Sequence, residues 1–155
     1  MKNKFIYAVL IVISLFLITG CNLSNKESNN QINNIEDKIN NNEVINSVKI
    51  LINNKEYTID LEDNKTVKEF INMLPQEFNM SELNGNEKYT YLDKSLPTNS
   101  VNPKHINVGD VMLFTDNCLV IFYKSFDTSY SYTKIGHIDN LPNLGDDSII
   151  VKIQK

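Results

Sequence analysis

Short stretches of alternating apolar and polar residues, separated by turns, recur from residue 48 onward and predict β-strands. The stretches 48–52 and 55–61 flank Asn53 and Asn54, and asparagine tolerates the positive φ angles of a two-residue hairpin turn. Further strands are predicted at 77–83, 87–92, 110–114, 118–124, 132–138 and 147–154. The polar stretch 93–109 is predicted to be a long loop. Seven or eight short strands at this spacing predict an antiparallel β-barrel that is closed or nearly closed.

One segment has helical rather than alternating periodicity. Its apolar residues follow an i, i+3, i+4, i+7 pattern: Val67, Phe70, Ile71 and Leu74. Thr66 and Glu69 have the spacing of a capping box at the helix start, and Pro75 is expected to end the helix. The sequence therefore predicts an all-β fold, a β-barrel with one or two short capping helices.

The first twenty residues have the pattern of an export signal. Lysines precede an apolar run at 5–18, which is shorter than the ~20 residues that a membrane-spanning helix needs. The run ends in ITGC at 18–21, which resembles the lipobox of bacterial lipoproteins: one aliphatic residue, two small residues and a cysteine. The resemblance implies that residues 1–20 are a lipoprotein signal peptide and that a lipid on Cys21 holds the protein at the outer face of the cell membrane. An ordinary signal or an uncleaved anchor with an incidental cysteine is the alternative.

Residues 22–47 are polar, rich in asparagine and without an aromatic side chain. Such a composition buries too little apolar surface to offset the entropy of folding. We therefore expect residues 21–47 to be a flexible tether and residues 48–155 to be the folded domain. A linker of this length spans roughly 25–30 Å on average.

The charge of the chain argues against nucleic acid as a partner. Fifteen basic side chains, all of them lysine, stand against 19 acidic ones, which gives a net charge of −4. Without arginine the chain lacks the bidentate fork for phosphate and guanine, and without tryptophan it lacks the best stacking platform. We expect its partners to be the membrane, through the lipid on Cys21, and a peptide or small molecule.

The order of motifs in residues 48–155 resembles that of small bacterial cyclophilin-like domains. LINNKEYTIDLEDNKTVKEFINMLP is followed, after the long loop, by NVGDVMLF, LVIFYKSF and TKIGHID. The resemblance implies an antiparallel β-barrel closed by helices, as in cyclophilins. One departure is visible at 115–117, where a three-residue turn stands in place of the aromatic-glycine segment of the family.

The resemblance supports the fold of the cyclophilins more strongly than it supports their enzymatic activity. Cyclophilins isomerise X–Pro bonds with an arginine that stabilises the twisted amide, and this chain has no arginine. Lysine supplies a point charge without the fork. We therefore expect non-catalytic binding of a peptide or small ligand outside the cell. A divergent prolyl isomerase or foldase that acts on secreted proteins is the alternative, and a surface module without a small ligand is a third.

No arrangement of polar residues predicts a catalytic centre, a metal site or a cofactor. His105 and His137 have no carboxylate or cysteine at metal-ligand spacing, which favours surface or packing roles. Three carboxylates precede the helix and could hold Ca²⁺, but the helix dipole already accounts for them: Asp60, Glu62 and Asp63. Asp110 is expected to organise a turn. Cys118 has no evident activating base and is expected to pack as a small apolar residue.

Six aromatic residues gather within a span of nineteen: Phe114, Phe122, Tyr123, Phe126, Tyr130 and Tyr132. Phe122 and Tyr123 are neighbours on a strand and must face opposite sides of it. In cyclophilins the corresponding strand helps to line the proline pocket. Two interpretations stay open. Half of the rings fill the barrel beside a solvated tyrosine-rich loop, or the rings rim a groove at the barrel mouth that binds a peptide or small ligand.

Overall fold

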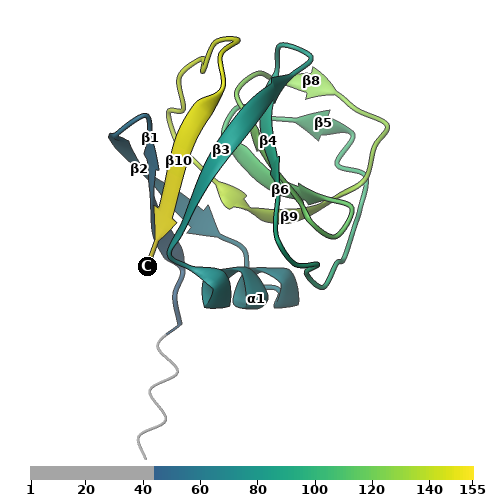
Figure 1. Ribbon diagram of the computed structural model, residues 1–155. Helices are drawn as coiled ribbons and strands as arrows, with labels where there is room; N and C mark the ends of the chain where they lie inside the picture. The colour runs from purple at the N-terminus through teal and green to yellow at the C-terminus, as the bar shows by residue number, and fades with distance from the viewer. Residues whose placement is uncertain (1–43) are drawn as a thin grey trace, which may run out of the picture. The chain divides into compact units, whose positions relative to one another are not determined.

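The computed structural model describes residues 44–155, and eight of its strands form a closed antiparallel barrel (Figure 1). Around the barrel the strands follow the order β1-β10-β3-β4-β7-β6-β9-β2. Their bounds are β1 (Ser47–Ile52), β2 (Lys55–Leu61), β3 (Gln76–Leu83), β4 (Glu87–Tyr91), β6 (Asp110–Phe114), β7 (Cys118–Phe122), β9 (Tyr132–His137) and β10 (Ile149–Gln154). The predicted all-β barrel is confirmed. The predicted signal peptide, Cys21 and most of the predicted tether lie outside the described residues.

Asparagines make the predicted hairpin between β1 and β2. Asn53 and Asn54 have φ angles of 48° and 68°, and the two strands pair from Ser47 opposite Asp60 to Ile52 opposite Lys55. Positive φ at both central residues matches the right-handed twist of the flanking strands. Local sequence therefore sets the register of the first hairpin.

Side chains that point into the barrel form the main core. Along β10, for example, Ile149, Val151 and Ile153 are buried while the residues between them are exposed. This alternation is what a strand with one buried face requires. By contrast, β6 and β7 are buried on both faces, so something must also cover the barrel wall on their outer side.

The outer cover of β6 and β7 comes from a second, smaller sheet. β5 (His105–Ile106) pairs with β8 (Phe126–Asp127), and Ile106 and Phe126 pack onto an outer cluster with Met112, Val120 and Phe122. The long loop predicted at 93–109 is present, but the two residues of β5 interrupt it near its end. A strand of two residues is too short to produce an alternating pattern, so the sequence gives no local signal for it.

The helix α1 (Lys65–Met73) lies across one end of the barrel (Figure 1). Its four predicted apolar residues all belong to the main core, which confirms the predicted buried face: Val67, Phe70, Ile71 and Leu74. Within residues 44–155, no helix has the length and apolar character needed to cross a membrane.

The predicted capping box was wrong. The N-cap is Asn64, whose side-chain oxygen accepts a hydrogen bond of 2.9 Å from the backbone N–H of Val67. Thr66 already lies inside the first turn, where its side chain cannot cap. It is buried instead, and its hydroxyl donates a 2.6 Å hydrogen bond to the carbonyl of Pro97. Thr66 therefore fastens the long loop to the helix.

Candidate functional site

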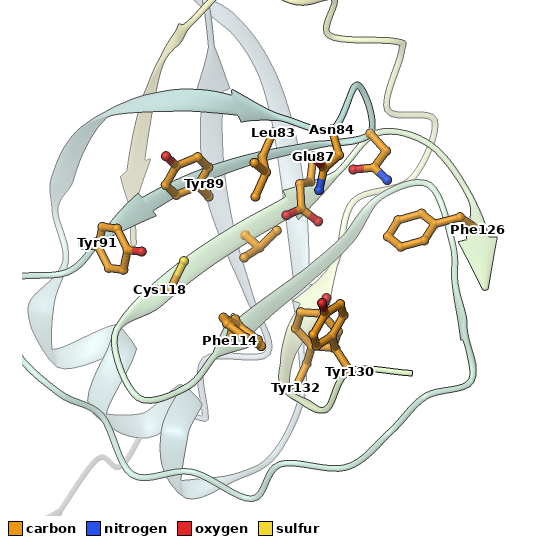
Figure 2. A pocket seen from close by; sticks show the side chains of 12 residues that line it. Leu83, Asn84, Glu87, Tyr89, Tyr91, Phe114, Cys118, Phe126, Tyr130 and Tyr132 are labelled. Carbon is orange, nitrogen blue, oxygen red and sulfur yellow. The ribbon is translucent and has the colours of Figure 1, made fainter. Parts of the chain in front are cut away.

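A pocket opens on the outer wall of the barrel, where β4, β7 and β6 are neighbours and the chain after β8 folds over them (Figure 2). Its volume of about 320 Å³ is at the small end of the range for pockets that hold small molecules. Twelve side chains line it: Leu83, Asn84, Asn86, Glu87, Tyr89, Tyr91, Phe114, Cys118, Val120, Phe126, Tyr130 and Tyr132. Half of these are aromatic. Glu87 is the one carboxylate among the twelve, and none of them is a lysine or histidine.

Strand alternation and pairing place the floor and one wall of this pocket. Glu87, Tyr89 and Tyr91 are alternate residues of β4, so they share its outward face. In the ladder with β7, Tyr89 lies opposite Val120. Tyr91 lies opposite Cys118 in the same ladder. Val120 and Cys118 are therefore the apolar floor beside a wall of two tyrosines.

Aromatic contacts hold both walls in place. The rings of Tyr89 and Tyr91 are 6.0 Å apart and nearly perpendicular. On the other side, Phe114 lies 5.5 Å from Tyr132 and 5.9 Å from Tyr130. The Tyr89–Tyr91 and Phe114–Tyr130 pairs are edge-to-face, an arrangement that is favourable beyond the area it buries. Figure 2 shows the two groups facing each other across the pocket, with the carboxyl of Glu87 between them.

The structure brings four of the six predicted aromatic residues to the pocket: Phe114, Phe126, Tyr130 and Tyr132. Phe122 lies beneath it, fully buried and 5.5 Å from Tyr132. Tyr123 faces the barrel interior, and its hydroxyl lies 3.3 Å from Glu82. One of the two interpretations placed a groove at the barrel mouth, whereas this pocket lies on the outer wall. The pocket is on the outer wall because the cover over β6 and β7 leaves a gap beside β4.

Glu87 has a perturbed acidity. Burial, reinforced by the nearby charge of Glu82, raises its pKa to about 7. Burial also raises the pKa of the Cys118 thiol to about 11, with Glu87 adding to the effect. At neutral pH the thiol is therefore protonated and a poor nucleophile, which agrees with the predicted packing role.

Replacement of Glu87 by glutamine is expected to make the folded domain more stable at pH 8. The folded carboxyl holds its proton up to about pH 7, whereas the unfolded one releases it near 4.5. Its contribution to stability is thus present below pH 4.5 and lost as the pH rises through 7. From pH 5 to pH 8, the free energy of unfolding of Glu87→Gln is expected to rise by on the order of 1–2 kcal/mol relative to that of the unsubstituted domain. This value is reduced to allow for the partial exposure of Glu87. Urea unfolding of residues 44–155 at both pH values measures this.

The control for that experiment is Glu56→Gln, which changes an exposed carboxylate that pairs with Lys49 at 3.0 Å. This variant is expected to show no comparable gain at pH 8. If Glu87→Gln and Glu56→Gln respond to pH alike, Glu87 has an ordinary acidity.

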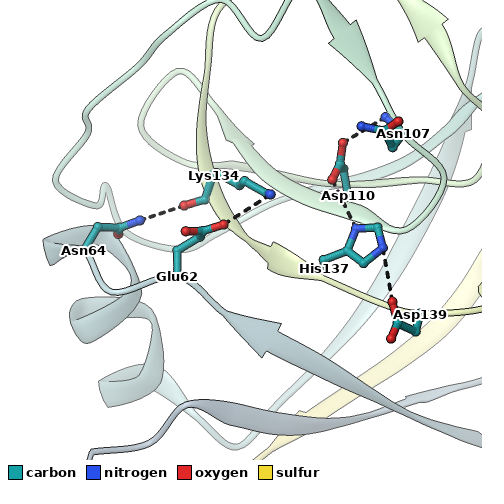
Figure 3. A network of polar contacts seen from close by, with 7 residues as sticks. All are labelled: Glu62, Asn64, Asn107, Asp110, Lys134, His137 and Asp139. Carbon is teal, nitrogen blue, oxygen red and sulfur yellow. Dashed lines mark hydrogen bonds and ion pairs between the residues drawn. The ribbon is translucent and has the colours of Figure 1, made fainter.

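A second polar cluster lies where β6 begins and β9 ends (Figure 3). Nδ1 of His137 is 3.2 Å from the buried carboxylate of Asp110, and Nε2 is 3.5 Å from Asp139. Asp110 also accepts a 2.9 Å hydrogen bond from the backbone N–H of Asn107, which confirms its predicted role in a turn. The same figure shows Lys134 paired with Glu62 at 3.2 Å. These contacts join the ends of strands.

The other candidate ligands have similarly ordinary partners. Nδ1 of His105 lies 2.7 Å from Asp127, across the ladder between β5 and β8. Asp63 pairs with Lys68 at 2.9 Å at the start of α1. Within residues 44–155, no group of three or more histidine, cysteine or acidic side chains is arranged to hold a metal ion.

The barrel contains a buried charge that was not predicted from the sequence. Lys88 is fully buried, and its ammonium donates hydrogen bonds to the carbonyls of Gly145 and Asp147 at 2.6 and 2.8 Å. It also lies 5.1 Å from the ring of Tyr123. Desolvation lowers the pKa of Lys88. The contacts tie the loop before β10 to β4, opposite the face that carries the pocket.

Fold and pocket together define a class of protein: a small closed antiparallel barrel, capped by one helix, with an aromatic pocket on its outer wall. The model of the cyclophilin-like family matches residues 50–154, which is well over half of the chain. The chain belongs to the cyclophilin-like family. Comparison with curated proteins and with solved structures gave no match.

Proposed function

We propose that this protein is a bacterial lipoprotein, anchored at the outer face of the membrane through Cys21, whose barrel binds a peptide or small ligand without catalysis. The aromatic pocket is the observation that carries the proposal. The lipobox-like ITGC at 18–21, which follows a short apolar run, supports the anchor.

The accessibility of the pocket supports binding. Tyr91 and Tyr130 rim it and remain 65% and 63% exposed, and Leu83 beside them is also exposed. Clustered exposed apolar side chains around a concave apolar floor are typical of ligand sites.

The chemistry of the lining supports binding over catalysis. Cys118 is protonated at neutral pH, and the lining offers Glu87 no histidine or lysine with which to transfer protons. The chain also lacks the arginine on which cyclophilin catalysis depends. We therefore expect residues 44–155 not to accelerate the isomerisation of X–Pro peptides.

Loss of Tyr130, one of the two exposed tyrosines at the rim of the pocket, is expected to weaken ligand binding. Probes are capped tripeptides with apolar, acidic, basic or proline central residues, titrated into residues 44–155 while NMR chemical shifts are followed. We expect at least one class to shift signals from the pocket. Tyr130→Ala should weaken that binding about tenfold, the equivalent of one aromatic contact.

The matched control is Ile150→Ala, which removes a side chain that is 52% exposed on β10 and outside the pocket. Its binding should equal that of the unsubstituted domain. Absence of any pocket shift at millimolar concentrations across the panel would overturn the binding proposal. Saturable isomerisation of a proline peptide would overturn its non-catalytic part.

A further inference from the structure

We infer that the ligand is an organic cation: an ammonium group on an apolar stem, held between Glu87 and the surrounding rings. The inference rests on the proposed function, because it names the class of ligand for the same pocket. The shared chemistry is found in a lysine side chain and in a free or headgroup quaternary ammonium.

Charge complementarity is the first argument. A carboxylate stands between two aromatic walls, and no positive side chain lines the pocket to neutralise it. The faces of tyrosine and phenylalanine rings attract cations, and several rings around one carboxylate are typical of sites for ammonium groups. An anion would meet repulsion from ionised Glu87, and a neutral ligand would gain no ionic attraction from it.

The second argument is that Glu87 has no ionic partner among residues 44–155. Elsewhere on the barrel, glutamates pair with lysines: Glu56 with Lys49 and Glu77 with Lys152, each at 3.0 Å. Glu87 is half-buried and takes part in no ion pair of the described domain. A partly desolvated carboxyl without a counter-charge is unfavourable, so a bound cation would relieve it.

The third argument comes from the neighbouring polar atom and the acidity of the site. Asn86 also lines the pocket, and its buried side-chain oxygen has no hydrogen-bond partner within the described domain. This oxygen is closed off from solvent, so an N–H donor of the ligand would reach it once the Asn86 amide turns toward the pocket. A cation beside Glu87 would lower the pKa of that carboxyl from about 7, so binding would release a proton.

Other groups near Glu87 do not titrate in the range of interest. Burial raises the pKa of the Cys118 thiol to about 11 and that of Tyr123 to about 12, and it raises the pKa of Tyr132 as well. These groups stay neutral between pH 6 and 8. Glu82 is a further negative charge that acts on Glu87, and it strengthens the attraction for a cation.

The experiment compares each cation with a neutral isostere. Choline is paired with 3,3-dimethyl-1-butanol, and N-acetyl-lysine methylamide with N-acetyl-norleucine methylamide, each titrated into residues 44–155 at pH 6 and 8. At pH 8 we expect at least one cation to bind about fivefold or more tightly than its isostere. Its affinity should fall about threefold or more at pH 6, up to the roughly tenfold change in the ionised fraction of Glu87.

Glu87→Gln should reduce the preference for the cation to what the rings alone supply and should abolish its dependence on pH, whereas Glu56→Gln should preserve both. The pair that shows the effect identifies the source as a lysine side chain or a quaternary ammonium. Equal binding of cation and isostere would overturn the cation inference and leave the proposed binding function intact. Failure of every cation to bind would also overturn it, and binding of the wider tripeptide panel would then decide the proposed function separately.

Discussion

Replacement of Gly109 by alanine is expected to destabilise the folded domain by about 3 kcal/mol or more. Gly109 has a φ angle of 93°, a region that side chains with a Cβ rarely adopt. A Cβ there would overlap the carbonyl oxygen of Ile138 and lie 3.1 Å from the ring of His137. Backbone strain and steric overlap each cost ~1–3 kcal/mol.

The backbone around Gly109 has no room to relax. Its N–H donates a 2.8 Å hydrogen bond to the carbonyl of Phe122, and its carbonyl accepts a 2.9 Å hydrogen bond from the N–H of Ile138. The residue is thus fastened to the ends of β7 and β9 at once. A backbone shift that relieved the overlap would break one of these two hydrogen bonds and loosen the barrel where β7 and β9 end.

Gly145→Ala is the matched control. Gly145 has a φ angle of 67°, yet nothing lies within 4 Å of a Cβ built there. Its substitution keeps the conformational penalty of ~1 kcal/mol and omits the overlap. Urea unfolding of the two variants separates these contributions. Equal losses for both would show that close approach at Gly109 is unimportant.

Much of the barrel could be predicted from the sequence because several of its strands form hairpins or have one buried face. The alternation along β10 and the asparagine turn at Asn53 are local patterns, and each is read within about ten residues. The contacts of Thr66 are different. Whether a threonine caps a helix or fastens a loop depends on the position of Pro97, thirty-one residues away.

The candidate site could be predicted only in part, because it also depends on contacts between segments that are distant in the sequence. The concentration of aromatic residues after position 113 identified Phe114, Phe126, Tyr130 and Tyr132. The opposite wall is on β4, and it becomes a wall only because β4 pairs with β7. A Glu-x-Tyr-x-Tyr pattern at 87–91 was a visible signal for one shared strand face. Which side of the barrel that face would cover depended on pairing between distant segments.

The small sheet of β5 and β8, which covers the outer side of β6 and β7, explains why the pocket exists. These strands are buried on both faces, so their outer apolar residues require a second layer. That layer is short, and it ends before it reaches β4. The pocket is therefore a consequence of a cover narrower than the apolar surface beneath it, and the exposed Tyr91 and Tyr130 lie at the border of that cover.

Replacement of Cys21 by serine is expected to abolish lipid attachment in a bacterium that processes lipoproteins. The proposed acyl acceptor is the thiol of Cys21, and a hydroxyl is a much weaker nucleophile than a thiolate. Burial of acyl chains contributes ~0.8 kcal/mol for each CH₂ group, and two or more chains are needed for lasting attachment. We expect incorporation of labelled palmitate to disappear and residues 1–20 to remain on the variant, as measured by mass spectrometry.

Cys118→Ser is the matched control, since Cys118 is the other cysteine of the chain and is buried in the barrel wall. A serine there is expected to leave palmitate incorporation and signal removal unchanged. Lipid labelling that persists in Cys21→Ser would contradict the proposed anchor, whatever the state of the barrel. Normal labelling of Cys118→Ser beside unlabelled Cys21→Ser would assign the lipid to Cys21, because the two variants differ only in which thiol is lost.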